Sequence, residues 1–301
     1  MALWTPLNSD NAQVWLKSDT GITDDGGPGG PPPNVSIWAN QIPGVTNGAS
    51  FFQTDSAKFP SIGAGLNGIQ GIEFDGTDEF LGAGDIATLD DFGTFMMAAV
   101  IKPTLDVPAR AILSKGTGAA DGSFSWRINN QKTNHKLTFT IFDADNNPAN
   151  SVSMNSNANP ISNETDTICL VYRTSTTAQH RVNGADNGSA GDSNFMNAVS
   201  GNVSFAALVG EFSGGGCEPF DGLMYEVVAV GNNFSNLDDI DSVEGYLAHR
   251  FALVSNLPST HQYSDFAPAA GLHGVHNQDL IGETSLDVSG PVVSDKLAGV
   301  I

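Results

Sequence analysis

Residues 222–253 read GLMYEVVAVGNNFSNLDDIDSVEGYLAHRFAL and contain two different patterns. Apart from Glu226, the first nine residues are mainly apolar and rich in β-branched side chains, which is typical of a β-strand. After Asn236, an N-cap residue type followed by acidic residues, apolar side chains recur at a helical spacing. They are Ile240, Val243, Leu247 and Phe251. The stretch therefore predicts a strand followed by one helix, near residues 237–251, whose apolar stripe packs against a sheet.

Short β-rich stretches recur along the rest of the chain, separated by clusters of Gly, Asn, Asp and Pro. Besides Gly222–Val230 they are Ala12–Leu16, Val35–Trp38, Gly71–Phe74, Phe95–Lys102, Ala111–Ser114, Phe124–Ile128, Lys136–Phe142, Thr167–Arg173, Gln179–Val182 and Ala206–Gly210. Many short strands at this spacing predict a β-sandwich or jelly roll. Residues 24–33, DDGGPGGPPP, are interpreted as a solvated surface loop, with a contact arm as the alternative.

The chain of 301 residues carries 12 Lys and Arg against 33 Asp and Glu, a net charge of −21. Such an acidic protein lacks the clustered basic residues that bind nucleic acid or anionic lipid. The partners that this composition favours are neutral sugars, cations and other proteins.

No targeting segment is recognised at the start, MALWTPLNSD, which has no basic region and no apolar core of a signal peptide. The longest apolar run, around Phe95 to Ile101, is far shorter than the ~20 residues that span a bilayer. We expect a soluble protein without a classical secretion signal. The two cysteines, Cys169 and Cys217, are predicted to be buried free thiols, with a disulfide between them as the alternative.

Several segments in a fixed order carry a resemblance to a known family: GIEFDGTDEFL, FMMAAVIKP, ILSKG, SFSWRIN, LTFTIFD, AQHRVNG, PFDGLMYEVVAV and EGYLAHRFALVSNLPSTHQY. Over roughly residues 10–265 the chain resembles a laminin-G-like domain of the concanavalin A-like lectin/glucanase superfamily. The helix with its LPSTHQY exit is similar to the ends of such domains in bacterial surface proteins and tailed-phage virion proteins. The resemblance implies an all-β, two-sheet antiparallel jelly-roll sandwich with one C-terminal helix, and sugar, calcium or protein binding on its loops.

Acidic residues in the first of these segments resemble the catalytic motif of glycosidases with this fold. Glu73, Asp75, Asp78 and Glu79 come close to Glu-x-Asp-x-x-Glu, in which two carboxylates share one face of a sugar cleft. Position 78 is the shorter Asp, and Gly76 predicts a turn where the motif needs a strand. We therefore interpret the segment as a hairpin and expect no enzymatic activity.

Two further groups have the residue types of metal ligands. Asp143, Asp145 and Asn147 alternate as in a calcium loop, but the Gly and Glu that an EF-hand requires are missing. His273 and His276 form an HxxH pair without the glutamate of a zinc protease. We assign no catalytic, cofactor-binding or metal-ligating residue and expect no cofactor, with a looser calcium site as the alternative.

Four tryptophans are candidates for stacking on a sugar: Trp4, Trp15, Trp38 and Trp126. The last three lie within predicted strands, so core packing is the preferred interpretation for them. Residues 1–268 are predicted to form the domain. Residues 269–301 are predicted to form an extended arm that docks on a neighbour, because about 30 residues cannot build a core of their own.

Together these features favour a non-enzymatic surface protein of a tailed-phage virion, most simply a capsid decoration (cement) protein stabilising the shell through subunit contacts. We expect it on the virion surface after assembly in the host cytoplasm. Expected partners are the major capsid protein, further copies of the chain, for which a trimer matches icosahedral lattices, and host-surface glycans. Nucleic acid and membranes are not expected. The alternatives are a carbohydrate-binding adhesin or tail-fibre lectin module and, third, a glycoside hydrolase.

Overall fold

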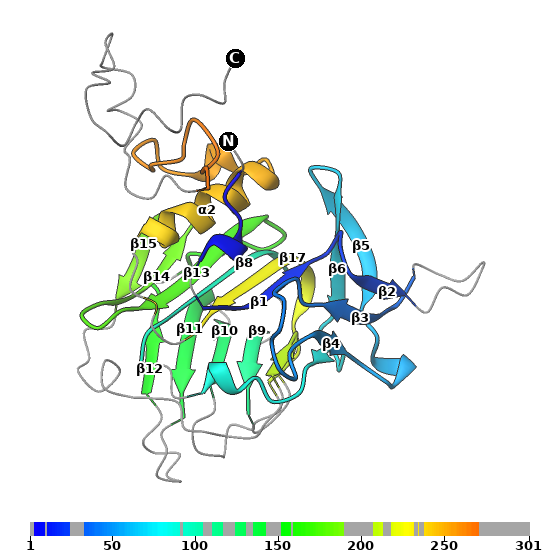
Figure 1. Ribbon diagram of the computed structural model, residues 1–301. Helices are drawn as coiled ribbons and strands as arrows, with labels where there is room; N and C mark the ends of the chain where they lie inside the picture. The colour runs from blue at the N-terminus through cyan, green and yellow to red at the C-terminus, as the bar shows by residue number, and fades with distance from the viewer. Residues whose placement is uncertain are drawn as a thin grey trace, which may run out of the picture.

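In the residues that it describes, the computed structural model is a two-layer β-sandwich with one α-helix against its outside (Figure 1). It describes residues 3–9, 11–24, 33–90, 93–104, 110–116, 124–130, 135–142, 152–157, 159–189, 207–212, 218–231, 234 and 238–270. Among these residues, no helix has the length and apolar character needed to cross a membrane.

Eight of the described strands form an antiparallel sheet, here called the central sheet, in the order β15-β14-β13-β8-β17-β6-β5, with β1 also paired to β17. Their bounds are β1 (Ala12–Lys17), β5 (Ser61–Leu66), β6 (Ile69–Asp75), β8 (Phe95–Pro103), β13 (Thr167–Arg173), β14 (Ala178–Val182), β15 (Ala185–Ser189) and β17 (Asp221–Val230). One side of β17 pairs with β8. Its other side pairs first with β6 and then with β1, so β17 joins the N-terminal strand to the middle of the sheet.

The remaining nine described strands form the outer sheet, also antiparallel, in the order β12-β11-β10-β9-β16-β7-β4-β3-β2. Their bounds are β2 (Ile22–Asp24), β3 (Val35–Ala39), β4 (Ser50–Phe52), β7 (Leu81–Gly82), β9 (Arg110–Lys115), β10 (Phe124–Asn130), β11 (His135–Ile141), β12 (Val152–Asn155) and β16 (Ala207–Val209). Short 3-10 turns occur at η1 (Pro6–Asn8), η2 (Ser56–Lys58), η3 (Ala87–Leu89) and η5 (Val254–Asn256).

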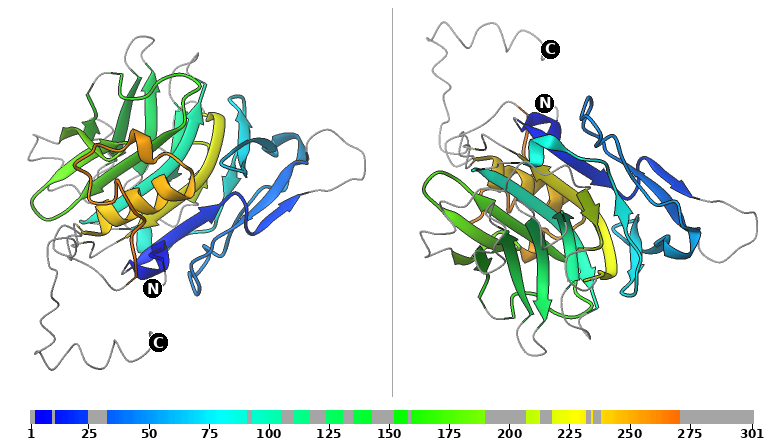
Figure 2. Two further views of the ribbon diagram at one scale, coloured as in Figure 1. Left: turned by 90° about the horizontal axis from the view of Figure 1, so that it is seen from above. Right: turned by 90° about the horizontal axis from the view of Figure 1, so that it is seen from below.

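The middle of the central sheet, strands β8, β13 and β17, is buried on both faces, because the outer sheet covers one face and helix α2 (Asp238–Arg250) covers the other (Figures 1 and 2). Strand β8 shows the consequence. Phe95, Met97, Ala99 and Ile101 enter the core between the sheets, whereas Met96, Ala98 and Val100 pack in the cluster beneath α2. This double burial explains why FMMAAVI contains no polar residue, since each successive side chain points into one apolar layer.

A β-bulge in β17 decides which way its acidic residue points. The register with β8 shifts between Met224 and Glu226, and the side-chain alternation changes phase there. Val227 therefore faces the core between the sheets, and Glu226 faces α2. There the fully buried Glu226 carboxylate accepts hydrogen bonds from Trp15 Nε1, at 2.5 Å, and from Arg250 Nε, at 2.7 Å. Without the bulge, this carboxylate would enter an apolar core.

The predicted helix is confirmed, over Asp238–Arg250. All four residues of its predicted apolar stripe, Ile240, Val243, Leu247 and Phe251, are buried in the cluster against the central sheet. The predicted N-cap, Asn236, lies outside the described residues. Gly245 lets the LPSTHQY exit approach the helix, because a Cβ there would lie 2.5 Å from the Tyr263 Cβ.

The predicted fold class is confirmed, and each predicted strand corresponds to an observed one with its ends shifted by at most two residues. The sequence did not predict β2, β4, β5, β7, β12 and β15, which are short, polar or rich in glycine. The boundary predicted at residue 268 stays a prediction. Residues 269 and 270 are described, with Ala269 bridged to Leu3, and the rest of the predicted arm lies outside the described residues.

Trp15, Trp38 and Trp126 are buried, as predicted. Trp4, which the sequence left as a candidate for stacking on sugar, is only 1% exposed. Its backbone N–H donates to the Pro268 carbonyl, at 2.9 Å, and its ring lies 6.1 Å from that of Tyr246.

Cys169 is buried and free, as predicted, and burial raises the pKa of its thiol. Cys217 lies outside the described residues.

Candidate functional site

The acidic segment predicted to be a hairpin forms a tight turn after β6. The Thr77 N–H donates to the Asp75 carboxylate, and the Asp75 N–H donates to Glu79 Oε2, both at 2.8 Å. Gly76 adopts a φ of +72° in the left-handed region, which suits a turn and interrupts strand β6. Burial raises the pKa of Glu79 to about 7, with a further contribution from Asp75, Asp78 and Glu73. The carboxylates therefore cap a turn, and neither of the two pockets described below includes them.

The predicted metal-ligand candidates Asp143, Asp145 and Asn147 and the HxxH pair, His273 and His276, lie outside the described residues. Within the described residues, another group has the composition of a metal site. Asp241 and Glu244 of α2 and His261 of the LPSTHQY exit bring three ligand atoms within 4.8 Å of one another. The expectation that the protein needs no cofactor remains a prediction.

A cation already balances that group, namely the guanidinium of Arg181 from β14. It contacts Glu244 at 2.8 Å and Asp241 at 3.1 Å. Burial alone would lower the pKa of Arg181, but Glu244, Asp241 and the neighbouring Asp186 outweigh it and raise the pKa. His261 Nδ1 accepts the Tyr263 N–H, at 3.2 Å, so Nε2 carries the proton and faces the Glu244 carboxylate, at 3.3 Å. The cluster is a structural ion network that ties α2 to β14.

A row of hydroxyl groups crosses four strands of the outer sheet on the face away from the core. Ser114, Ser125, Thr140 and Ser153 lie opposite one another in register. Ser114 donates to the Glu211 carbonyl, at 2.6 Å, and Thr140 bonds Ser153, at 2.8 Å. Ser114, Ser125 and Thr140 are at most 2% exposed. A ligand therefore cannot reach most of this row in the observed conformation.

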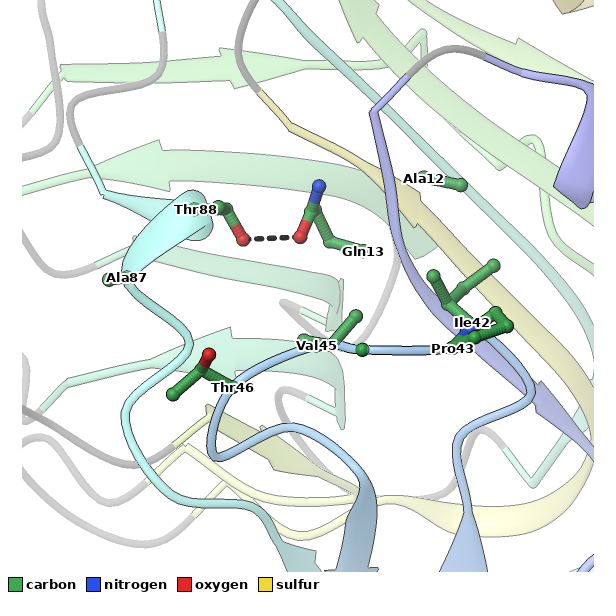
Figure 3. Close-up of a pocket in the computed structure, with 9 residues that line it drawn as sticks. Ala12, Gln13, Ile42, Pro43, Val45, Thr46, Ala87 and Thr88 are labelled. Carbon is green, nitrogen blue, oxygen red and sulfur yellow. Dashed lines mark hydrogen bonds between the residues drawn. The ribbon is translucent and has the colours of Figure 1, made fainter.

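An open pocket of about 310 Å³ lies between β1, the loop that follows β3 and the turn η3 (Figure 3). Its apolar wall consists of Ile42, Pro43 and Val45 with two alanines, and its polar side chains are Gln13, Thr46 and Thr88. None of the lining residues is ionisable or aromatic. Although the chain has a net charge of −21, the side chains that line this pocket carry no charge.

The side chain of Asn40 holds the pocket loop against β1. Its Oδ1 accepts the N–H groups of Trp15, at 2.8 Å, and Ile42, at 3.1 Å. Its Nδ2 donates to the carbonyls of Gln13, at 2.7 Å, and Gly48, at 2.9 Å. These four bonds use the full hydrogen-bonding capacity of the amide. The loop is therefore fixed in shape before any ligand arrives, as is common for binding pockets.

Two side chains from different elements meet at the polar end of the pocket. Thr88 Oγ1 of η3 donates to Gln13 Oε1 of β1, at 2.5 Å, and Figure 3 shows the two groups facing each other. Gln13 Nε2 donates to the Asn11 carbonyl, at 3.0 Å. Because a carbonyl only accepts, this contact fixes which way the amide is turned.

The sequence analysis missed this pocket. Its lining comes from three stretches separated by about 30 to 40 residues, residues 12–13, 42–46 and 87–88, and each contains ordinary loop or strand residue types. The strand prediction Ala12–Leu16 covered β1 but carried no sign that Gln13 faces a hollow. The clearest available signal was Asn40, which lies just after the predicted strand Val35–Trp38. Asparagine side chains often bond nearby backbone groups in turns.

No protein-family model matches the chain, and no curated protein matches it. Among solved structures, it is similar to the IT-sialidase CBM40 of Ruminococcus gnavus bound to alpha2,3 sialyllactose, at 16% identity, covering 55% of this chain and 91% of that one, with a TM-score of 0.41. It is also similar to domain 4 of AbnA, a GH43 extracellular arabinanase of Geobacillus stearothermophilus in complex with arabinotriose, at 14% identity over 74% and 93%, with a TM-score of 0.45.

A third similar structure is the binding domain of botulinum neurotoxin DC in complex with SialylT, at 12% identity over 80% of this chain and 52% of that one, with a TM-score of 0.45. The class of this protein follows from its own topology. It is an antiparallel β-sandwich of the jelly-roll kind, closed on one face by a helix.

Proposed function

We propose that this protein is a non-enzymatic carbohydrate-binding module that holds a neutral saccharide in the pocket between β1, the loop after β3 and η3. The observation that carries the proposal is the chemistry of that pocket: a preformed hollow with neutral polar groups at one end, an aliphatic wall, and no ionisable lining residue. Ligand pockets combine apolar walls with a few fixed polar groups in this way.

The size and the charge of the pocket both favour a small neutral ligand. Its volume of about 310 Å³ lies at the lower end of the ~300–1,000 Å³ range of ligand pockets, which suits one or two sugar rings. A charged ligand would lose its hydration without meeting an opposite charge in the lining, which is costly. A saccharide brings hydroxyl groups for Gln13 and the threonines and C–H faces for the aliphatic wall.

This proposal corresponds to the carbohydrate-binding alternative of the sequence analysis. The preferred interpretation there, a capsid decoration protein on the virion surface, remains a prediction. So do the capsid protein as partner, the trimer and the role of residues 269–301. Imaging of where the protein lies on a particle would test them.

The test is calorimetric or NMR titration of the full chain with a panel of neutral mono- and disaccharides. We expect millimolar or tighter binding that Thr88→Val weakens at least tenfold, because valine keeps the shape of threonine and removes the hydroxyl. The control is Thr176→Val in the turn between β13 and β14, which should bind like the unaltered protein. Absence of binding across the panel, or equal binding by Thr88→Val, would refute the proposal.

The absence of catalysis has its own assay. The protein is incubated with laminarin and other β-glucans, and released reducing sugar is measured. We expect none above background, and Glu73→Gln should leave this result unchanged. Hydrolysis that disappears in Glu73→Gln would show that the turn after β6 is an active site.

A further inference from the structure

We infer that the saccharide held in the pocket is an acetamido sugar, such as an N-acetylhexosamine, recognised through its acetamido group. The inference rests on the proposed function and narrows it to one class of ligand. Its basis is the match between the polar groups that the pocket still has available, the apolar wall beside them, and the carbonyl, methyl and hydroxyl groups that an acetamido sugar carries.

The hydroxyl of Thr88 can only accept a hydrogen bond from a ligand. Its single proton already points at Gln13 Oε1, at 2.5 Å, so only the oxygen lone pairs remain. A ligand group that meets Thr88 must therefore be a donor, such as an N–H or a hydroxyl.

The Gln13 amide nitrogen has the opposite role. It carries two protons, and the structure gives it one hydrogen bond, to the Asn11 carbonyl at 3.0 Å. Its second proton can be donated to a ligand acceptor. The orientation of this amide is held at both ends, by Asn11 and by Thr88, so donor and acceptor keep fixed positions beside each other.

The wall next to these groups is aliphatic. Ile42, Pro43 and Val45 line the pocket on the loop that Asn40 fixes to β1 (Figure 3). Among the lining residues there is no aromatic ring on which the broad C–H face of a plain hexose could stack. A small wall of this kind suits a methyl group.

An acetamido sugar supplies each missing partner: the acetamido carbonyl accepts from Gln13, a ring hydroxyl donates to Thr88, and the acetamido methyl packs on the aliphatic wall. A plain hexose can satisfy the two polar groups with hydroxyls but has no methyl for the wall. A hexosamine with a free amine would bring a positive charge to a lining without carboxylates. Of these three classes of sugar, only the acetamido sugar is neutral and also brings a methyl group to the wall.

The experiment compares matched sugars on the unaltered full chain: N-acetylglucosamine and N-acetylgalactosamine against glucose, galactose and glucosamine, by titration calorimetry. We expect the acetylated sugars to bind at least tenfold more tightly, and saturation-transfer NMR to give the strongest signal at the N-acetyl methyl. Val45→Thr, which keeps the shape of the wall and adds a hydroxyl, should reduce this preference, whereas the control Thr176→Val should keep it.

The outcomes separate the two proposals. Equal binding of acetylated and plain sugars, or tighter binding of the plain ones, would overturn the inference and leave carbohydrate binding intact. No binding of any sugar would overturn both. A preference for acetylated sugars that Val45→Thr and Thr88→Val leave unchanged would place the acetamido site elsewhere on the protein and overturn the assignment to this pocket.

Discussion

Two hollows of similar volume flank the N-terminal part of the chain, and they differ in what their polar groups are already doing. The neutral pocket of Gln13 and Thr88 measures about 310 Å³. The second hollow, about 290 Å³, lies between the N-terminal segment and α2 and is lined by Trp4, Tyr246, His249 and Arg250, together with Leu3, Ala267 and Pro268.

In the second hollow the charged groups hold the fold together. Arg250 contacts the buried Glu226 and also Asp19, both at 2.7 Å, and the His249 ring nitrogen Nε2 donates to the Tyr263 carbonyl, at 2.9 Å. Burial raises the pKa of Glu226, although Arg250, Trp15 and Tyr246 act in the opposite direction. In the neutral pocket, Gln13 keeps a donor and Thr88 keeps an acceptor. Groups with remaining capacity indicate binding, and groups whose capacity is used indicate structure.

The largest effect is expected from Arg250→Met, in the structural hollow. It leaves the Glu226 carboxylate buried without its cation, and breaking a buried pair on one side costs about 3–5 kcal/mol of unfolding free energy. Urea denaturation measures this loss. The control is Asp19→Asn, whose side chain is 34% exposed and which should cost less than about 1 kcal/mol. Equal costs for both variants would contradict the structural role of Glu226.

The next largest effect is a pH dependence that we expect in the stability of the fold but not in saccharide binding. His180 of β14 is fully buried, and its Nε2 donates to the Met154 carbonyl of the outer sheet, at 3.1 Å. Burial lowers its pKa from 6.5 to about 4. Between these values the unfolded chain binds more protons than the folded one, so stability falls as the pH drops from 6.5 towards 4.

The size of this loss is about 3 kcal/mol for a shift of this extent. Urea titrations at several pH values should show it, and His180→Gln should remove this part of the pH dependence. Saccharide affinity measured on the folded protein should stay flat over the same range, because no lining residue of the pocket is ionisable. An affinity that follows the His180 titration would contradict the division between the two regions.

The smallest change in stability, with a large change in affinity, is expected from Asn40→Ala. It removes four hydrogen bonds, but the neighbouring loop is partly open to water, which can replace several of them. We expect a loss of about 2 kcal/mol and at least tenfold weaker saccharide binding, since the pocket loop is no longer held in place. Full affinity in a folded Asn40→Ala protein would show that the loop does not shape the site.

Sequence patterns predicted the fold because burial leaves a direct trace in residue type. Long apolar strands such as β8, and the helical spacing of Leu247 and its neighbours, record which faces meet an apolar layer. The short strand β7 is different. It pairs with β16 and β4 through only a few residues, so its tertiary partners stabilise it and it leaves little pattern in the sequence.

The sequence by itself determined the sandwich, the helix and its apolar stripe, the burial of Cys169 and three tryptophans, and the turn at Gly76. Only the tertiary structure decided that Trp4 is buried, that a bulge turns Glu226 towards Arg250, and that Gln13, Val45 and Thr88 share one pocket. The physical reason is the separation along the chain over which each effect acts. Apolar periodicity acts between neighbours along the chain, whereas a binding pocket depends on hydrogen bonds between segments that meet only after the sheets have formed.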